Sequence, residues 1–157
     1  MQPRIDHRKY SGEPLKALYD IERYLAGGGL DPKLLHLIKM RASQINGCAY
    51  CLDMHSIDAR AAGETEQRLY TLDAWHETPF FSDRERAALA WTEAITRVAE
   101  THVPDELFEE VKKHFSEKEI VDLTLALGMI NLWNRLSISL RSVPGHYRPA
   151  KASGAAS

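Results

Sequence analysis

The amino-acid sequence predicts an all-α fold, a compact bundle of about six to seven helices. Apolar residues recur three and four positions apart through most of the 157 residues, which is the spacing of helices with one buried face. Two Ser-x-x-Glu patterns, at Ser82–Glu85 and Ser116–Glu119, are typical of helix starts. Since no segment of the sequence shows the convincing alternation of a β-strand, we expect no sheet.

The first two helices are predicted on either side of a glycine triplet. Apolar side chains recur at helical spacing between residues 14 and 25, at Leu15, Leu18, Ile21 and Leu25. The triplet at 27–29 should end this helix, because no strand precedes it and no Gly-Lys-Ser/Thr pattern follows, as a phosphate loop would require. Asp31 and Pro32 then predict a capped start for a helix that continues to about Ile45.

Five more helices are predicted in the rest of the chain. The pair Asn46 and Gly47 marks a break, after which a helix carries both cysteines and ends at Gly63. The remaining helices are predicted over residues 66–75, 82–102, 104–115 and 116–140. The last of them is apolar around much of its circumference, so we expect it either at the centre of the core or in a subunit interface.

Size and composition favour one globular domain without affinity for nucleic acid or membranes. The hydrophobic content of 44% is normal for a globular core, and the formal net charge of −2 offers no basic surface to nucleic acid or anionic lipid. The N-terminus lacks the apolar run of a secretory signal, and polar residues interrupt the apolar region 120–140. We therefore expect a cytoplasmic protein with a single domain, residues 1–141, and a flexible tail, residues 142–157.

Cys48, Cys51 and His55 form the candidate catalytic site. On a helix, residues three and four apart share one face, so all three side chains can converge. The Cα atoms of the two cysteines should lie roughly 5 to 5.5 Å apart, within the range that a disulfide tolerates. Because cytosolic proteins rarely keep a structural disulfide, a close pair there is more often redox-active or metal-binding.

The position of His55 distinguishes the two cysteines. A thiol reacts as its thiolate, and the imidazole of His55 can accept the Cys51 proton or, as imidazolium, stabilise the thiolate. The unpaired N–H groups of a helix that begins near Gly47 would also favour negative charge. Cys51 is therefore the better candidate for the nucleophile, and Cys48 would convert its sulfenic acid to a disulfide or protonate the leaving oxygen.

Other interpretations of the same residues stay open. The cysteines could be buried small hydrophobes. Two thiolates and the imidazole of His55 would also suit Zn²⁺, with His36 as fourth ligand, in a metal-binding or redox-sensing oligomer, although no second Cys-x-x-Cys completes the usual pattern. Asp58, three positions after His55, could contact it, but we expect a surface pair there.

The sequence around this site resembles the alkylhydroperoxidase D-like proteins of the carboxymuconolactone decarboxylase superfamily. The resemblance covers roughly residues 34–140, and its core is the run of residues 37–55. Further matches lie at Ala59-Arg60, Gly63-Glu64, the Trp75 segment, residues 85–89 and residues 131–135. The resemblance implies an all-α homo-oligomer, a hexamer or trimer, that reduces organic or hydrogen peroxides in antioxidant defence, and we expect no cofactor.

The resemblance also implies roles for individual residues. Cys51 would form the sulfenic acid, Cys48 would be its resolving partner, and His55 would belong to a proton relay. The disulfide would be reduced by a dithiol reductant, a lipoyl-bearing or thioredoxin-like protein. Members of the decarboxylase branch would instead be cofactor-free lyases, but that branch generally lacks the cysteine motif.

His36 is a departure from the pattern of the family. The family often has a glutamate twelve residues before the first cysteine, and this chain has His36 there. An imidazole can orient His55 by hydrogen bonding, but it supplies no negative charge to strengthen His55 as a base. We therefore place His36 at the relay position with a weaker effect than a carboxylate.

Overall fold

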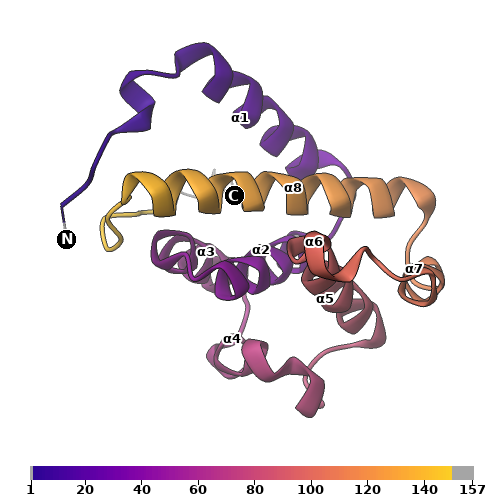
Figure 1. Cartoon of the computed structure of the whole chain (residues 1–157). Helices are drawn as coiled ribbons and strands as arrows, with labels where there is room; N and C mark the ends of the chain where they lie inside the picture. The colour runs from indigo at the N-terminus through magenta and orange to yellow at the C-terminus, as the bar shows by residue number, and fades with distance from the viewer. Residues whose placement is uncertain (1, 150–157) are drawn as a thin grey trace, which may run out of the picture.

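The computed structural model describes residues 2–149, and this part of the chain contains eight α-helices and two short 3₁₀ helices (Figure 1). The α-helices are α1 (Gly12–Gly27), α2 (Pro32–Asn46), α3 (Ala49–Ala61), α4 (Glu66–Thr71), α5 (Asp83–Thr96), α6 (Val98–Thr101), α7 (Asp105–Lys112) and α8 (Glu117–Leu140). The 3₁₀ helices are η1 (His7–Lys9) and η2 (Leu72–Glu77). Residues 2–149 form no strand, which confirms the predicted all-α fold.

Polar side chains cap the helices where the sequence predicts their starts. The carboxylate of Asp31 accepts a hydrogen bond of 2.7 Å from a backbone N–H in the first turn of α2. Ser82 and Ser116 form complete capping boxes with Glu85 and Glu119, in which each side chain accepts a hydrogen bond from the other residue's backbone N–H. These bonds pair N–H groups that a helix start leaves free, and so fix where α2, α5 and α8 begin.

Two of the predicted helices are each divided in the structure. The single helix expected over residues 82–102 is wrong, because Arg97 has φ −106° and ψ 35°, outside the helical range, and separates α5 from α6. The helix expected over residues 66–75 is α4 followed by η2, with non-helical angles at Ala74. Neither break contains glycine or proline, so the sequence carried no local signal for it.

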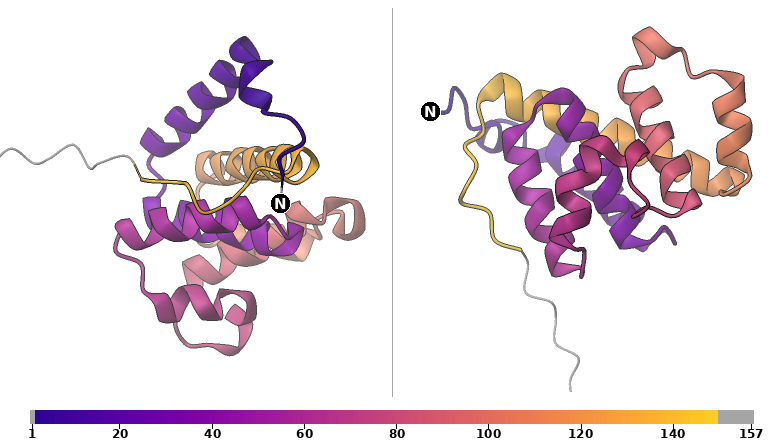
Figure 2. Two further views of the ribbon diagram at one scale, coloured as in Figure 1. Left: turned by 90° about the vertical axis from the view of Figure 1, so that its left-hand side faces the viewer. Right: turned by 90° about the horizontal axis from the view of Figure 1, so that it is seen from below.

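Helix α2 lies at the centre of the fold. It packs against α3, α5 and α8, and Figures 1 and 2 show the long α8 beside it. Leu37, Ile38 and Ala42 of α2 are completely buried. Burial of a leucine or isoleucine side chain stabilises a fold by about 1.5–3 kcal/mol, so α2 provides a firm support for the segment that follows it.

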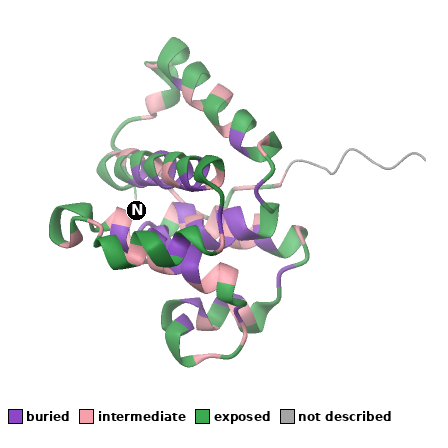
Figure 3. Ribbon diagram, turned by 90° about the vertical axis from the view of Figure 1, so that its right-hand side faces the viewer, coloured by how far each residue is buried: buried purple, intermediate pink, exposed green. Residues whose placement is uncertain are grey.

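Helix α8 lies between α1 and the rest of the bundle. Figure 1 shows α1 on one side of α8 and α2 with α3 on the other, and α8 contacts all three. Leu123, Leu127 and Ile130 are completely buried, whereas Val121 and Leu125 are exposed, and Figure 3 shows this mixture along the helix. Of the two positions expected for α8, the structure therefore shows the one in the core, and the subunit interface stays a prediction. Among residues 2–149, no helix combines the length and apolarity that crossing a bilayer requires.

Buried amide and hydroxyl groups fix the register between α2 and α8. Asn134 donates a hydrogen bond of 3.0 Å to the hydroxyl of Ser43. The side-chain amide of Asn46 donates to the side-chain oxygens of Asn134 at 2.8 Å and of Asn131 at 2.9 Å. Asn134 and Ser43 are completely buried, so a shift of either helix would leave polar groups unpaired at a cost of about 1–3 kcal/mol each. This network holds the end of α2 immediately before the two cysteines.

The described end of the chain, residues 142–149, returns to α3 (Figure 2). The backbone N–H of Gly145 donates to Asp53 at 2.8 Å, and the hydroxyl of Tyr147 donates to Asp58. These contacts place the first half of the predicted tail, while residues 150–157 lie outside the described residues. The flexibility predicted for residues 142–157 concerns motion and stays a prediction.

Candidate active site

Gly47 positions the two cysteines at the junction of α2 and α3. It ends α2 with φ 68° and ψ 34°, in the left-handed region that glycine adopts without a Cβ clash. The N–H of Cys48 then bonds to the carbonyl oxygen of Ser43 at 3.0 Å, which closes the end of α2. Cys48 itself has extended backbone angles and is the N-cap residue of α3.

Cys48 and Cys51 form a disulfide in the first turn of α3. Their Cα atoms lie 5.4 Å apart, within the separation expected from the sequence. The Sγ atom of Cys48 also accepts a hydrogen bond of 3.4 Å from the N–H of Cys51, as an N-cap acceptor does. Each cysteine is only 1% exposed. The pair is therefore within bonding reach, at a helix start whose dipole favours a thiolate.

His55 lies one turn after Cys51 on the same face of α3. It is only 6% exposed, and its burial lowers the pKa of the imidazole to about 3, with smaller contributions from the positive charges of Lys39 and His36. The ring is therefore neutral near physiological pH. The imidazolium that the sequence left as an alternative is therefore disfavoured by burial.

His36 reaches the site from α2, as its position in the sequence predicts. The ring centroids of His36 and His55 are 6.1 Å apart, with their planes inclined by 51°. His36 is half-buried, and this burial lowers its pKa, although the negative charge of Asp58 opposes the shift. Within residues 2–149, the Nδ1 atoms of both histidines are buried and have no hydrogen-bond partner.

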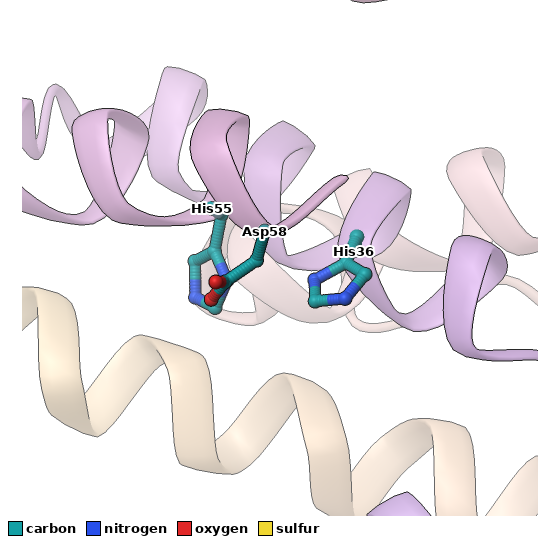
Figure 4. Close-up of side chains that lie close together, drawn as sticks. All are labelled: His36, His55 and Asp58. Carbon is teal, nitrogen blue, oxygen red and sulfur yellow. The ribbon is translucent and has the colours of Figure 1, made fainter. Parts of the chain in front are cut away.

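Asp58 is the residue at this site that sequence reasoning misplaced. We expected a surface pair, but Asp58 is half-buried, and Figure 4 shows its carboxylate beside His55 with His36 facing them from the neighbouring helix. One donor atom from each of the three side chains lies within 4.8 Å of the others. The spacing of three residues from His55 was the available signal. Nothing in the sequence indicates that this face of α3 is covered, so the spacing alone does not predict the buried contact.

Tyr147 is a second contributor that the sequence did not indicate. Its hydroxyl lies 2.8 Å and 3.0 Å from the two carboxylate oxygens of Asp58. Burial, followed by the hydrogen bond to Asp58, raises the pKa of Tyr147 to about 12, so the phenol stays protonated and donates. The position of Tyr147 in a segment of small residues, proline and glycine gave no local sign of this contact.

Comparison with known proteins identifies the sequence family. The family model of the carboxymuconolactone decarboxylase family matches residues 13–94, which include both cysteines, His36, His55 and Asp58 but not Tyr147. The chain is 45% identical over 140 residues to the uncharacterized protein YdfG of Bacillus subtilis (strain 168), covering 89% of this chain and 95% of that protein.

Two solved structures share the fold. The first is a protein of unknown function from Agrobacterium tumefaciens, suggested to be the antioxidant defence protein AhpD. It has a TM-score of 0.89 and 44% identity, over 93% of this chain and all of that one. The second is an uncharacterized peroxidase-related protein from Silicibacter sp. TM1040, with a TM-score of 0.77 and 25% identity, over 85% of this chain and 71% of that one.

Proposed function

Because the chain belongs to the carboxymuconolactone decarboxylase family, as an alkylhydroperoxidase D-like member, we propose that it is a thiol peroxidase of antioxidant defence. The observation that carries the proposal is the pair Cys48 and Cys51, bonded in the first turn of α3 with His55 one turn later. A redox-inert structural pair would not need a neutral, buried base on the same helical face.

Cys51 is the proposed peroxidatic residue. His55 takes up the proton of the Cys51 thiol as the sulfur attacks the terminal oxygen of the peroxide. The O–O bond breaks, Cys51 becomes a sulfenic acid, and the leaving alkoxide or hydroxide takes up a proton to give an alcohol or water. Because burial disfavours the imidazolium, His55 passes the proton to the leaving oxygen as the O–O bond breaks and does not hold it as a charged intermediate.

Cys48 then resolves the sulfenic acid. Its sulfur attacks the sulfur of Cys51, water leaves, and the disulfide forms. The Cα separation of 5.4 Å allows this step without rearrangement of the helix. Two electrons from a dithiol reductant, a lipoyl-bearing or thioredoxin-like protein, restore both thiols. His36 and Asp58 hold the relay around His55, and Asp58 supplies a negative charge near the ring of His36.

A thiol count tests the proposal. The reduced, metal-free protein receives about one equivalent of hydrogen peroxide or cumene hydroperoxide, and free thiols are followed against time. We expect rapid loss of two thiols in wild type and no disulfide in Cys51→Ser. In Cys48→Ser, the matched control, we expect a sulfenic acid at Cys51 that dimedone traps. Persistence of both thiols in wild type would remove the peroxidase proposal.

We also propose that the protein is a homo-oligomer. Val121, Leu125 and Leu132 expose 57%, 45% and 36% of their surface, and their spacing of four and seven residues puts them on one face of α8. An exposed apolar face of this kind is typical of subunit contacts. Light scattering coupled to size-exclusion chromatography gives the mass directly. A monomeric mass at micromolar concentration would contradict this proposal without affecting the thiol chemistry.

A further inference from the structure

We propose that His36, His55 and Asp58 bind a divalent transition-metal ion, in a site that does not use the cysteine sulfurs. The zinc site considered from the sequence combined two thiolates with His36 and His55. The disulfide removes both thiolates, and the donor group that the structure assembles among residues 2–149 has the carboxylate of Asp58 as its third member. The inference does not depend on the proposed peroxidase activity.

The backbone places three donors around one point. His55 and Asp58 are three residues apart on α3 and share a face, while His36 projects from α2, which packs directly against α3. The three donor atoms lie within 4.8 Å of one another. Ligands at about 2.0–2.2 Å from a tetrahedral ion are roughly 3.4 Å apart. Each donor atom therefore needs to move by less than about 1 Å, which side-chain rotation provides.

The two histidines have unpaired nitrogens that point to a missing partner. The Nδ1 atoms of His36 and His55 are buried and make no hydrogen bond within residues 2–149. Only 6% of the surface of His55 is exposed, so solvent does not supply the missing hydrogen bond to its ring. Native proteins rarely leave a buried polar atom without a partner, and a bound ion is one of the usual partners in such cases.

Asp58 accepts a hydrogen bond from a neighbouring side chain, as the carboxylates that bind metal ions commonly do. Tyr147 donates its hydroxyl to the carboxylate, which orients the oxygens and leaves lone pairs free to coordinate. The positive charge of Lys39 lowers the pKa of both His36 and His55. Its ammonium forms an ion pair of 2.6 Å with Glu22, which offsets the positive charge that a second cation would meet.

The ligand types indicate which ions fit. Two imidazoles and one carboxylate form the set that binds Zn²⁺ in catalytic sites, where a fourth position stays open to water, and the same set binds Fe²⁺. Hard ions such as Mg²⁺ and Ca²⁺ prefer oxygen donors throughout and should compete poorly. A small pocket of about 150 Å³ is lined by His36, Lys39 and Glu22, so His36 is the ligand that borders it.

Zn²⁺ titration of the disulfide form tests the site apart from thiol chemistry. We expect calorimetry to give one equivalent of Zn²⁺ per chain, with affinity reduced at least about tenfold in His36→Gln and in Asp58→Asn. His76→Gln removes an exposed histidine from outside the group and should bind as wild type does. Tyr147→Phe should weaken binding by about tenfold, because the carboxylate loses its orienting donor.

X-ray absorption at the zinc edge provides the independent measurement. We expect nitrogen and oxygen neighbours and no sulfur, in the chain that retains its disulfide. Failure to bind Zn²⁺, undiminished affinity in Asp58→Asn, or loss of affinity in His76→Gln would each overturn the site. Because the disulfide form is used, absence of peroxidase activity leaves this result unaffected, and absence of zinc binding leaves the thiol count unaffected.

Discussion

Acidification from about pH 7.5 to about pH 5.5 should destabilise the folded protein, because His55 is buried as the neutral imidazole. Its pKa is about 3 in the folded state against an ordinary value of 6.5. Well above pH 6.5 both states hold the ring neutral, and His55 contributes no pH dependence. Between these two pKa values the unfolded chain binds a proton that the folded chain does not, so stability falls as the pH falls.

The size of the effect follows from the two pKa values. At about pH 5.5 the unfolded ring is roughly 90% protonated, and uptake of that proton favours unfolding by about 1 kcal/mol. His36, whose pKa burial also lowers, acts in the same direction. Carboxylates with lowered pKa values, such as Glu85 and Glu93, titrate below this window, so the histidines dominate it.

Urea denaturation at the two pH values, followed by circular dichroism, measures the difference. Glutamine at position 55 keeps a polar side chain but binds no proton. Between the two pH values, the free energy of unfolding should therefore fall by about 1 kcal/mol less in His55→Gln than in wild type. His76→Gln, which changes an exposed ring, should behave as wild type does. Equal loss of stability in wild type and His55→Gln would refute the assignment of His55 as a buried neutral base.

Three further substitutions test the site and its support. His36→Glu should raise the rate of disulfide formation with peroxide roughly two- to tenfold, because a carboxylate there would make His55 a stronger base; an equal or lower rate in a folded variant counts against the relay. Asn134→Ala should cost about 2–3 kcal/mol in urea denaturation, because Ser43 and Asn46 lose a buried partner; a cost below about 0.5 kcal/mol would mean that the network does not fix α8. Gly47→Ala should cost about 1 kcal/mol, because alanine is strained at φ 68°, and Gly27→Ala, at a helical glycine with open space around it, is the matched control.

Features set by neighbours in sequence were predicted well. The capping boxes at Ser82 and Ser116 depend on residues three apart, so their chemistry is written in the local sequence. The same holds for Cys48, Cys51 and His55, whose helical spacing determines that they share a face. The separation of 5.4 Å between the cysteine Cα atoms matches the estimate made from helix geometry alone.

Features that depend on tertiary packing were not predictable in the same way. Asp58 and Tyr147 meet because residues 142–149 return across α3, a contact between residues 89 positions apart. The break at Arg97 has no local sequence signal, since neither glycine nor proline lies there. The burial that makes His55 neutral likewise arises from the surrounding helices, so the sequence left both the neutral and the charged ring open.

The contact between Tyr147 and Asp58 also bears on the order in which the protein folds. Closing a loop of 89 residues costs about 4 kcal/mol of chain entropy in a flexible chain, whereas one hydrogen bond contributes about 1 kcal/mol. The contact therefore forms only after α2, α3 and α8 have packed and brought the segment near. Cys48, Cys51 and His55 lie within eight residues of sequence and come together as soon as α3 forms. The two cysteines and His55 are thus brought together early in folding, and the carboxylate side of the site is added late.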